Sequence, residues 1–275
     1  MPAVDAAEVP LLERLAAFDR LVVAFSGGVD SSYLLATAAD ALGSRAVAAT
    51  AVSASLAHDE LQAARSFAAA LGVRHLEVAT DEMARAAYRR NDGDRCFACR
   101  TALFDALEPI TAALGSAAVA VGTITDDLSE HRPGQRAAAL RGVHTPLADA
   151  GLGKADVRRL ARARGLVTWD KPAAACLASR VAYGLTVTPA RLARIERAEA
   201  WLRSRLDATA NLRVRDHGDV ARIEVDRDRI AAVVALADEA AAVLGELGWS
   251  HVTVDLSGFR SGSLNAALPW RIGQP

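Results

Sequence analysis

The stretch LVVAFSGGVDSS, residues 21–32, predicts a buried strand, a tight loop and the start of a helix. Two glycines at the turn let backbone N–H groups approach an anion closely, beside the positive end of the helix dipole. The spacing matches neither G-x-x-x-x-G-K-[ST] nor G-x-G-x-x-G, the two common glycine-rich phosphate loops. We therefore expect a phosphate-binding loop of the form S-G-G-x-D-S. Its candidate binding residues are Ser26, Gly27, Gly28, Asp30, Ser31 and Ser32.

Helical and strand patterns alternate on both sides of this loop. A short amphipathic helix is expected at 5–18, helices at 31–42 and 59–71, and buried strands at 46–52 and 73–78. Such alternation predicts a doubly wound parallel sheet with right-handed crossovers and helices on both faces. Ligands of such sheets bind at the carboxyl ends of the strands, where the loop lies.

The next strand brings further polar residues to the same edge. A helix at 101–114 precedes the strand 117–122, which ends in Gly122 and is followed by Asp126 and Asp127. The two aspartates fit either a helix cap or a pair of metal ligands, and the sequence leaves both open. A polar loop, a basic helix and a last short strand follow at 131–134, 154–164 and 166–168.

The composition changes at Lys171, where a loop without clean periodicity begins. Beyond it the patterns predict a smaller α+β domain, so we divide the chain into domains 1–184 and 185–275. Its expected elements are helices at 189–206 and 227–244, strands at 211–215, 220–225 and 251–256, and a Gly/Ser loop at 257–265.

The composition disfavours several classes of partner. The 275 residues carry 32 basic and 33 acidic side chains, a net charge of −1, and so create no overall field for nucleic acid or a membrane surface. No apolar run has the length of a membrane span, and the N-terminus lacks a basic region followed by an apolar stretch. We expect a cytoplasmic protein that binds neither nucleic acid nor membrane.

The chain has three cysteines, Cys96, Cys99 and Cys176, and this odd number disfavours a disulfide framework. The C-x-x-C lies among arginines, which favour thiolates, in a segment that resembles a loop. Three thiolates suit a 4Fe-4S cluster with one open iron, or a zinc site completed by His or water. Buried cysteines acting as small apolar residues are the third alternative.

The loop S-G-G-x-D-S resembles the pyrophosphate loop of the N-type ATP pyrophosphatases, which cut ATP between the α and β phosphates. The resemblance implies an adenine nucleotide α-hydrolase-like fold, ATP as cosubstrate and Mg²⁺ near Asp30. It also implies that Gly122 lies close to the nucleotide. A loop without lysine can hold the departing pyrophosphate through amides, hydroxyls and the metal.

Six motifs together resemble the LarE family, the ATP-dependent sulfurtransferases of nickel-pincer nucleotide cofactor synthesis. They are SGGVDSS (26–32), DRCFACR (94–100), VGTITDDLSEHRPG (121–134), WDKPAAACLASRVAYG (169–184), RVRDHGDVARIEV (213–225) and LSGFRSGSLN (256–265). In that family ATP adenylates a carboxylate of pyridinium-3,5-dicarboxylic acid mononucleotide, and sulfur then displaces AMP to give a thiocarboxylate. Some members sacrifice the sulfur of one cysteine; others hold a 4Fe-4S cluster on three, the pattern found here.

The resemblance also implies site residues. Cys176 is the expected catalytic residue and, with Cys96 and Cys99, a cluster ligand. The substrate phosphate is assigned to Ser179, Arg180, Arg213 and Arg260, because phosphate recognition needs forked donors. Glu199 and Glu224 match acidic positions that the family has near the site and are further candidates for holding a metal.

Three other functions compete with this interpretation. A tRNA-thiolating ATP pyrophosphatase would share the loop, but the neutral charge and the lack of a basic appended domain disfavour it. An amide-forming synthetase of the amidotransferase type would carry a glutaminase domain, and no such domain is expected in this sequence. A nucleotide-binding redox sensor without turnover is the third. The expected partners are a small nucleotide substrate, further copies of the chain in a homo-oligomer, and a sulfide or persulfide donor.

Overall fold

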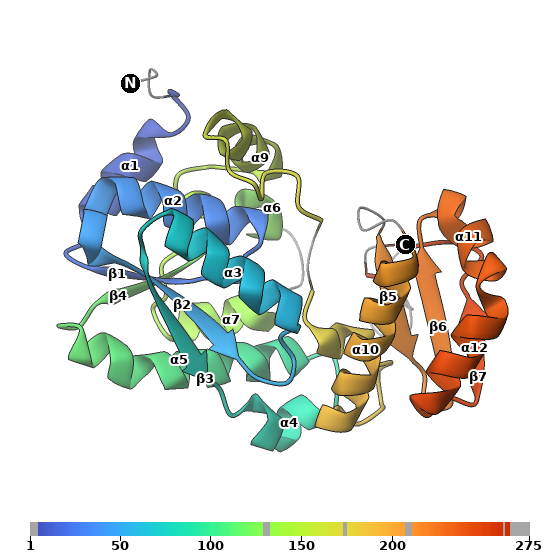
Figure 1. The fold of residues 1–275 in the computed structure, drawn as a ribbon. Coiled ribbons are helices and arrows are strands. Elements are labelled where there is room, and N and C mark those ends of the chain that lie inside the picture. The colour runs from blue at the N-terminus through green and yellow to red at the C-terminus, as the bar shows by residue number, and fades with distance from the viewer. Residues whose placement is uncertain (1–4, 129–132, 173–174, 207–210, 261, 265–275) are drawn as a thin grey trace, which may run out of the picture. The chain divides into compact units, whose positions relative to one another are not determined.

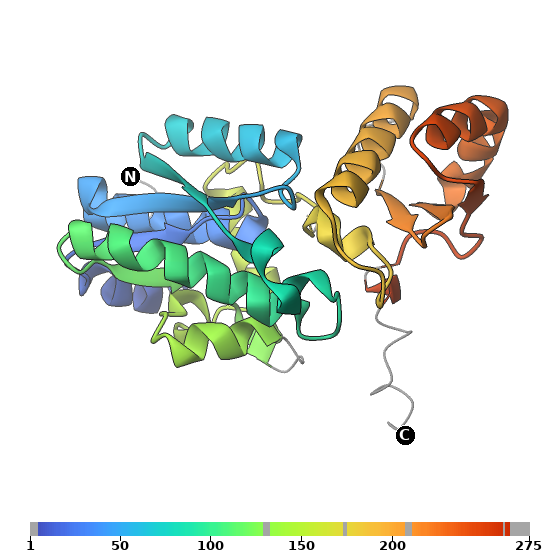
Figure 2. The same cartoon turned by 90° about the horizontal axis from the view of Figure 1, so that it is seen from below.

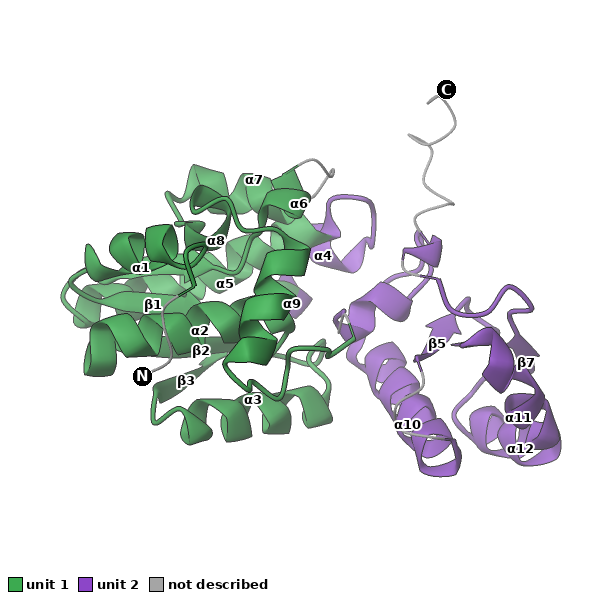
Figure 3. Cartoon of the chain, turned by 90° about the horizontal axis from the view of Figure 1, so that it is seen from above, with its two compact units in different colours: residues 1–82, 96–174 green, residues 83–95, 175–275 purple. Residues whose placement is uncertain are grey.

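The computed structural model describes residues 5–128, 133–172, 175–206, 211–260 and 262–264. The chain forms two compact units, one of residues 1–82 and 96–174, the other of residues 83–95 and 175–275 (Figure 3). The second unit thus takes a short segment from inside the first half of the sequence. Whether residues 1–184 and 185–275 fold as independent domains stays a prediction.

The first unit is built on a four-stranded parallel sheet (Figure 1). Its strand order is β3-β2-β1-β4, so the chain starts in the middle of the sheet, winds to one edge and then crosses to the other. The strands are β1 (Leu21–Ala24), β2 (Ala46–Val52), β3 (Arg74–Ala79) and β4 (Ala118–Val121). The predicted doubly wound parallel sheet is confirmed.

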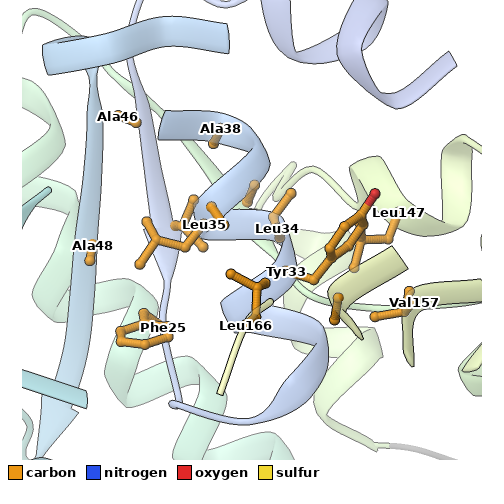
Figure 4. Packing of buried hydrophobic residues seen from close by; sticks show 14 of the residues in the cluster. Phe25, Tyr33, Leu34, Leu35, Ala38, Ala46, Ala48, Leu147, Val157 and Leu166 are labelled. Carbon is orange, nitrogen blue, oxygen red and sulfur yellow. The ribbon is translucent and has the colours of Figure 1, made fainter. Parts of the chain in front are cut away.

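Helices cover both faces of this sheet, because residues along each strand alternate between two cores. Leu21 and Val23 of β1 belong to one core, which Figure 4 shows from close by, and Val22 belongs to the other. The first core is closed by α1 (Val9–Ala16), α2 (Val29–Leu42), α3 (His58–Ala70), α8 (Pro146–Asp149) and α9 (Lys154–Ala163). The second is closed by α5 (Arg95–Ala113) and α7 (Pro133–Leu140), green and yellow-green in Figure 2.

The short elements η1 (Gly43–Arg45) and α6 (Thr125–Leu128) complete the unit, and η2 (Glu82–Ala84) lies where the chain passes into the second unit. Across the described ranges, no helix combines the length and the apolar composition that crossing a membrane requires.

Three sequence expectations for this unit are wrong. Helix α5 begins at Arg95, not at residue 101, because the Asp92 side chain accepts the Asp94 N–H and forms the turn that starts the helix. The C-x-x-C is therefore helical. Residues 166–168 form a turn, since the Leu166 N–H is taken by Ala161 O at the end of α9. Residues 133–134, expected in a polar loop, begin α7; residues 131–132 lie outside the described residues.

The second unit is the expected α+β fold. Strands β5 (Leu212–Asp216) and β6 (Val220–Val225) form an antiparallel hairpin, and β7 (His251–Val254) runs parallel to β6. Thr188 caps the N-terminus of helix α10 (Pro189–Arg205), because its side chain accepts the Arg191 N–H. The single helix expected at 227–244 is instead η4 (Arg227–Arg229), α11 (Ile230–Ala235) and α12 (Ala237–Glu246), because the Leu236 backbone leaves the helical region at φ −97°, ψ 13°.

The inserted segment, which contains α4 (Ala86–Arg89), is held by hydrogen bonds to residues far along the chain. Asn91, fully buried, donates to Val181 O at 3.2 Å and Ala182 O at 2.8 Å. The Val187 N–H donates to Arg89 O at 2.9 Å. These bonds make residues 83–95 part of the second unit.

Candidate functional site

The phosphate-binding loop lies between β1 and α2, as expected. Gly27 adopts φ +71°, a conformation that glycine reaches without strain, and α2 begins directly after Gly28. The backbone N–H groups of the first turn of α2 are therefore available at its N-terminus, at the carboxyl edge of the sheet.

Serine hydroxyls organise the loop. Ser26 Oγ lies 3.0 Å from Ser31 Oγ, and Ser31 Oγ donates to Gly28 O at 3.2 Å. Ser32 Oγ is buried and has no hydrogen-bond partner among the residues described. A buried hydroxyl normally pairs, so an unpaired one on this loop suits a ligand oxygen.

Gly122 is placed against the loop by β4. A Cβ at this position would lie 2.8 Å from the Ser31 backbone nitrogen and 3.0 Å from the Asp30 carbonyl carbon. No other residue type fits without displacing the start of α2. The structure thus brings Gly122 to Asp30 and Ser31, which the sequence assigned to the same site.

Asp126 and Asp127 act as caps in the structure. Asp126 Oδ2 accepts the Lys154 N–H at 2.8 Å, and Asp127 Oδ2 accepts the Ile124 N–H at 3.2 Å. The first of these bonds fixes the start of α9. Of the two alternatives that the sequence left open, these contacts favour the cap.

Two lysines that sequence reasoning missed contact the loop. Lys154 Nζ lies 2.9 Å from Asp30 Oδ2, and Lys171 Nζ donates to Gly27 O at 3.0 Å and to Glu60 Oε2 at 2.6 Å. The loop motif contains no lysine, and both residues come from more than a hundred positions further along the chain. The only sequence signal was the positive charge of the helix and loop that carry them.

Asp30 is the one carboxylate of the loop itself, and it lies in the first turn of α2. Mg²⁺ usually binds proteins through one or two carboxylates and completes its shell with substrate phosphates and water, so Asp30 fits that ion. In the described ranges, no three His, Cys, Asp or Glu side chains are grouped to hold a metal by themselves.

The second unit gathers arginines and glutamates in pairs. Arg180, in the turn η3 (Leu177–Arg180), donates through Nε to Glu199 Oε1 at 3.0 Å, and Arg215 Nη2 to Glu224 Oε2 at 2.7 Å. All four side chains are buried. Arg215 was not among the predicted site residues; it lies two residues after Arg213 in β5, so the two side chains point to the same face of the sheet.

Charges around the buried arginines shift two pKa values. Burial lowers the pKa of Arg213 to about 10, and the nearby guanidinium groups of Arg180 and Arg215 act in the same direction. Burial alone would raise the pKa of Glu199, but Arg180 and Arg203 outweigh it and hold that pKa below its ordinary value. The cluster is therefore a concentration of positive charge, which suits an anion.

The remaining predicted residues of this unit differ in their placement. Arg180 donates to Ser179 Oγ at 3.1 Å, which keeps this pair together. Glu224 also accepts from Arg222 at 2.9 Å and from Ser263 Oγ at 2.7 Å. Arg260 is exposed on the loop after β7, and the described part of the chain shows no ion pair for it. Glu199 and Glu224 hold arginines here; their metal role stays a prediction.

None of the three cysteines forms a disulfide within the described chain. Cys96 and Cys99 lie three residues apart in the first turns of α5, so both occupy one side of the helix. Cys176 is exposed and directly precedes η3. Arg180 Nη1 donates to Cys176 O at 3.0 Å.

The fold and the loop define the class: a doubly wound parallel sheet with S-G-G-x-D-S at its carboxyl edge is that of a pyrophosphate-loop, ATP-using enzyme. Residues 11–92 match the asparagine synthase family model. An uncharacterized protein of Synechocystis is 42% identical over 94% of this chain and 97% of its own.

The pyridinium-3,5-bisthiocarboxylic acid mononucleotide synthase of Lactiplantibacillus plantarum is 38% identical over 94% of this chain and 93% of its own. This chain therefore belongs to the LarE family, that of the pyridinium-3,5-bisthiocarboxylic acid mononucleotide synthases.

Proposed function

We propose that this chain is an ATP-dependent sulfurtransferase that converts the carboxylates of pyridinium-3,5-dicarboxylic acid mononucleotide to thiocarboxylates. The observation that carries the proposal is the similarity, over 94% of the chain, to a protein named as the synthase of the bisthiocarboxylic acid mononucleotide. The phosphate-binding loop between β1 and α2 supports the use of ATP.

The reaction has two balanced steps for each carboxylate. A carboxylate oxygen attacks the α phosphorus of ATP, the bond between the α phosphorus and its bridging oxygen breaks, and pyrophosphate leaves with that electron pair. Hydrosulfide sulfur then attacks the acyl carbon, AMP leaves with its oxygen, and one proton is released. The loop amides and the hydroxyls of Ser26, Ser31 and Ser32 would stabilise the charge that develops on the phosphates.

Mg²⁺ would be held by Asp30 and would neutralise charge on the phosphate oxygens. The protein's own residues would hold the ribose-bound phosphate of the substrate: Ser179, Arg180, Arg213 and Arg215 from the buried cluster, with Arg260 from the loop after β7. Glu199 and Glu224 would keep the guanidinium groups in a fixed orientation.

Cys96, Cys99 and Cys176 would hold a 4Fe-4S cluster, since three thiols are the donor set for a cluster with one open iron. Such a cluster supplies an iron that can carry sulfide. We infer that the reaction takes place in the cytoplasm, because reduced thiols and ATP are both needed. The proposal also includes assembly of the chain into a homo-oligomer and a sulfide or persulfide donor that supplies the sulfur.

The function is tested by incubating the chain with Mg-ATP, sulfide and the dicarboxylic acid mononucleotide. We expect AMP and pyrophosphate only when that substrate is present, and a thiocarboxylate product by mass spectrometry. The Cys176→Ser variant should still form the acyl adenylate and pyrophosphate but lose both the release of AMP and the thiocarboxylate. AMP formation that depends on tRNA or ammonia instead, or no AMP at all, would contradict the proposal.

The sulfur source is tested by the iron and acid-labile sulfide content of protein purified without oxygen. A cluster requires about four of each per chain, and Cys99→Ser should lose both. Zinc in place of iron would indicate a structural Cys96–Cys99 site. Protein with neither metal would indicate Cys176 as a sacrificial or persulfide donor.

A further inference from the structure

The loop between β1 and α2 is held by two ammonium groups from elsewhere in the same unit. Lys154 Nζ contacts both carboxylate oxygens of Asp30, at 2.9 and 3.2 Å. Lys171 Nζ contacts the loop at a second point, donating to the carbonyl oxygen of Gly27 at 3.0 Å, and it also pairs with Glu60 Oε2 at 2.6 Å. Lysine is a common binder of polyphosphates, and here it is supplied from the segment 154–171 instead of from the loop.

The backbone of Lys154 is fixed by neighbouring residues. Its N–H donates to Asp126 Oδ2, and a Cβ on the preceding residue, Gly153, would lie 2.9 Å from that same oxygen. The Gly153 N–H in turn donates to Asp156 Oδ2 at 3.3 Å. Only the flexible side chain of Lys154 is therefore free to change partners, because its main chain is capped.

The pair formed by Lys154 and Asp30 is weak by its nature. The two side chains are 41% and 24% exposed, and ion pairs with this much solvent contribute little to folding. Asp30 is also the residue that fits Mg²⁺, and a divalent ion competes with one ammonium group for a carboxylate. An ion that takes Asp30 releases the Lys154 ammonium group beside the N-terminus of α2, where anions are favoured.

We propose that Lys154 is a pyrophosphate-binding residue that exchanges partners: it pairs with Asp30 in the ligand-free protein and with the departing pyrophosphate once Mg²⁺ occupies Asp30. Lys171, whose main-chain carbonyl accepts from Arg158 at 3.3 Å and whose ammonium group is held by Gly27 O and Glu60, is the fixed cation of the loop. The inference rests on the proposed function, because it concerns the ATP site of that reaction.

The test is equilibrium binding, by calorimetry on the full chain, of AMP, ATP and inorganic pyrophosphate, each with and without Mg²⁺. Lys154→Met should weaken ATP and pyrophosphate at least tenfold, since it removes a charged hydrogen bond, and leave AMP within about twofold. Arg159→Gln removes one positive charge from the same helix and should bind all three ligands as the wild type does.

The exchange itself is tested with Asp30→Asn. This variant cannot trap Lys154, so its binding of pyrophosphate without Mg²⁺ should equal or exceed that of the wild type. Addition of Mg²⁺ should then change its affinity less than twofold, whereas it should strengthen binding to the wild type.

The outcomes separate the two proposals. ATP binding by the wild type with unchanged ATP and pyrophosphate affinity in Lys154→Met would overturn this inference alone. Failure of the wild type to bind ATP at all would overturn the proposed function and the inference with it.

Discussion

Gly122 directly follows β4, at a position where a methyl group has no space, because the Ser31 backbone nitrogen would lie 2.8 Å from it. We predict that Gly122→Ala displaces the start of α2, weakens ATP binding at least tenfold, and costs about 1–3 kcal/mol of unfolding free energy. Calorimetry and urea unfolding measure the two effects.

Gly245 provides the matched control. It lies in α12, and a Cβ there would meet nothing within 4 Å. Gly245→Ala should leave ATP binding unchanged and stabilise the protein by roughly 0.5–1 kcal/mol, since alanine favours helix. Equal losses of ATP affinity in both variants would show that close packing at Gly122 is not the cause.

Two partly buried histidines make stability depend on pH. Burial lowers the pKa of His75 and of His217 below the ordinary value of 6.5. As the pH falls, the unfolded chain therefore takes up these protons at a higher pH than the folded protein does. The free energy of unfolding should be largest above about pH 6.5 and decrease as the pH falls toward the folded-state pKa values.

Urea unfolding at pH 7.5 and 5.5 measures this dependence. His217→Gln should unfold with a smaller difference between the two pH values than the wild type, because one of the two contributions is gone. His58→Gln, at an exposed position, should keep the full difference. An equal difference in all three proteins would contradict the assignment.

Helices α1, α2 and α9 meet at one buried carboxylate. Glu8 accepts from Tyr33 Oη at 2.6 Å and from Arg164 Nε at 2.8 Å. Burial and the hydrogen bond to Glu8 both raise the pKa of Tyr33. Tyr33→Phe should lower stability by about 1–2 kcal/mol, because one bond to a buried charge is lost.

A double-mutant cycle isolates this interaction from the effects of each substitution. Tyr33→Phe and Glu8→Gln are combined, and thermal unfolding is measured for all four proteins. The double variant should lose less than the sum of the two single losses. Strict additivity would show that the Tyr33–Glu8 bond does not couple the helices.

The regular elements were predictable from sequence because burial imposes their periodicity. Strand 46–52 matches β2 residue for residue, since its first four side chains alternate between the two cores. The start of α5 was missed because a side-chain bond from Asp92 decides it, and the break at Leu236 because both halves of that segment keep an apolar pattern. Local hydrogen bonds of this kind leave no periodic signal.

The site was predictable to the extent that its residues lie in one motif. The loop 26–32 and Gly122 meet because both follow strands of one parallel sheet. The contact between Lys154 and Asp30 joins residues 124 positions apart, and no pattern in either segment encodes it. The same holds for Arg215, which looks like any exposed strand residue until its burial is known.

The membership of residues 83–95 in the second unit can be tested in the intact chain. Asn91→Ala removes two hydrogen bonds from a fully buried side chain to main-chain carbonyl groups and should cost about 2–3 kcal/mol. Hydrogen exchange should then accelerate at the Gly184 and Val187 amides, which donate to Asn91 O and Arg89 O. Arg90→Gln, whose ion pair with Asp92 is exposed, should leave both rates unchanged.

No acceleration at these two amides in Asn91→Ala would contradict the role of the segment. The sequence placed a domain boundary near residue 184 but showed no sign of this insertion. Residues 83–95 carry no apolar period, and their bonds to the second unit are made by backbone groups and by the side chain of Asn91. A division read from sequence alone follows the order of the chain, whereas the compact units do not.

This insertion has a consequence for synthesis on the ribosome. Asn91 is made 90 residues before Val181, the first of its carbonyl partners. At roughly 5 to 20 residues per second, that interval lasts about 5 to 20 seconds. All four strands of the first unit are translated before it ends, so their sheet can close while the second unit is still incomplete. The rate of translation between codons 96 and 180 therefore sets how long the inserted segment lacks the hydrogen-bond partners that complete its fold. During that time it is accessible to chaperones and proteases.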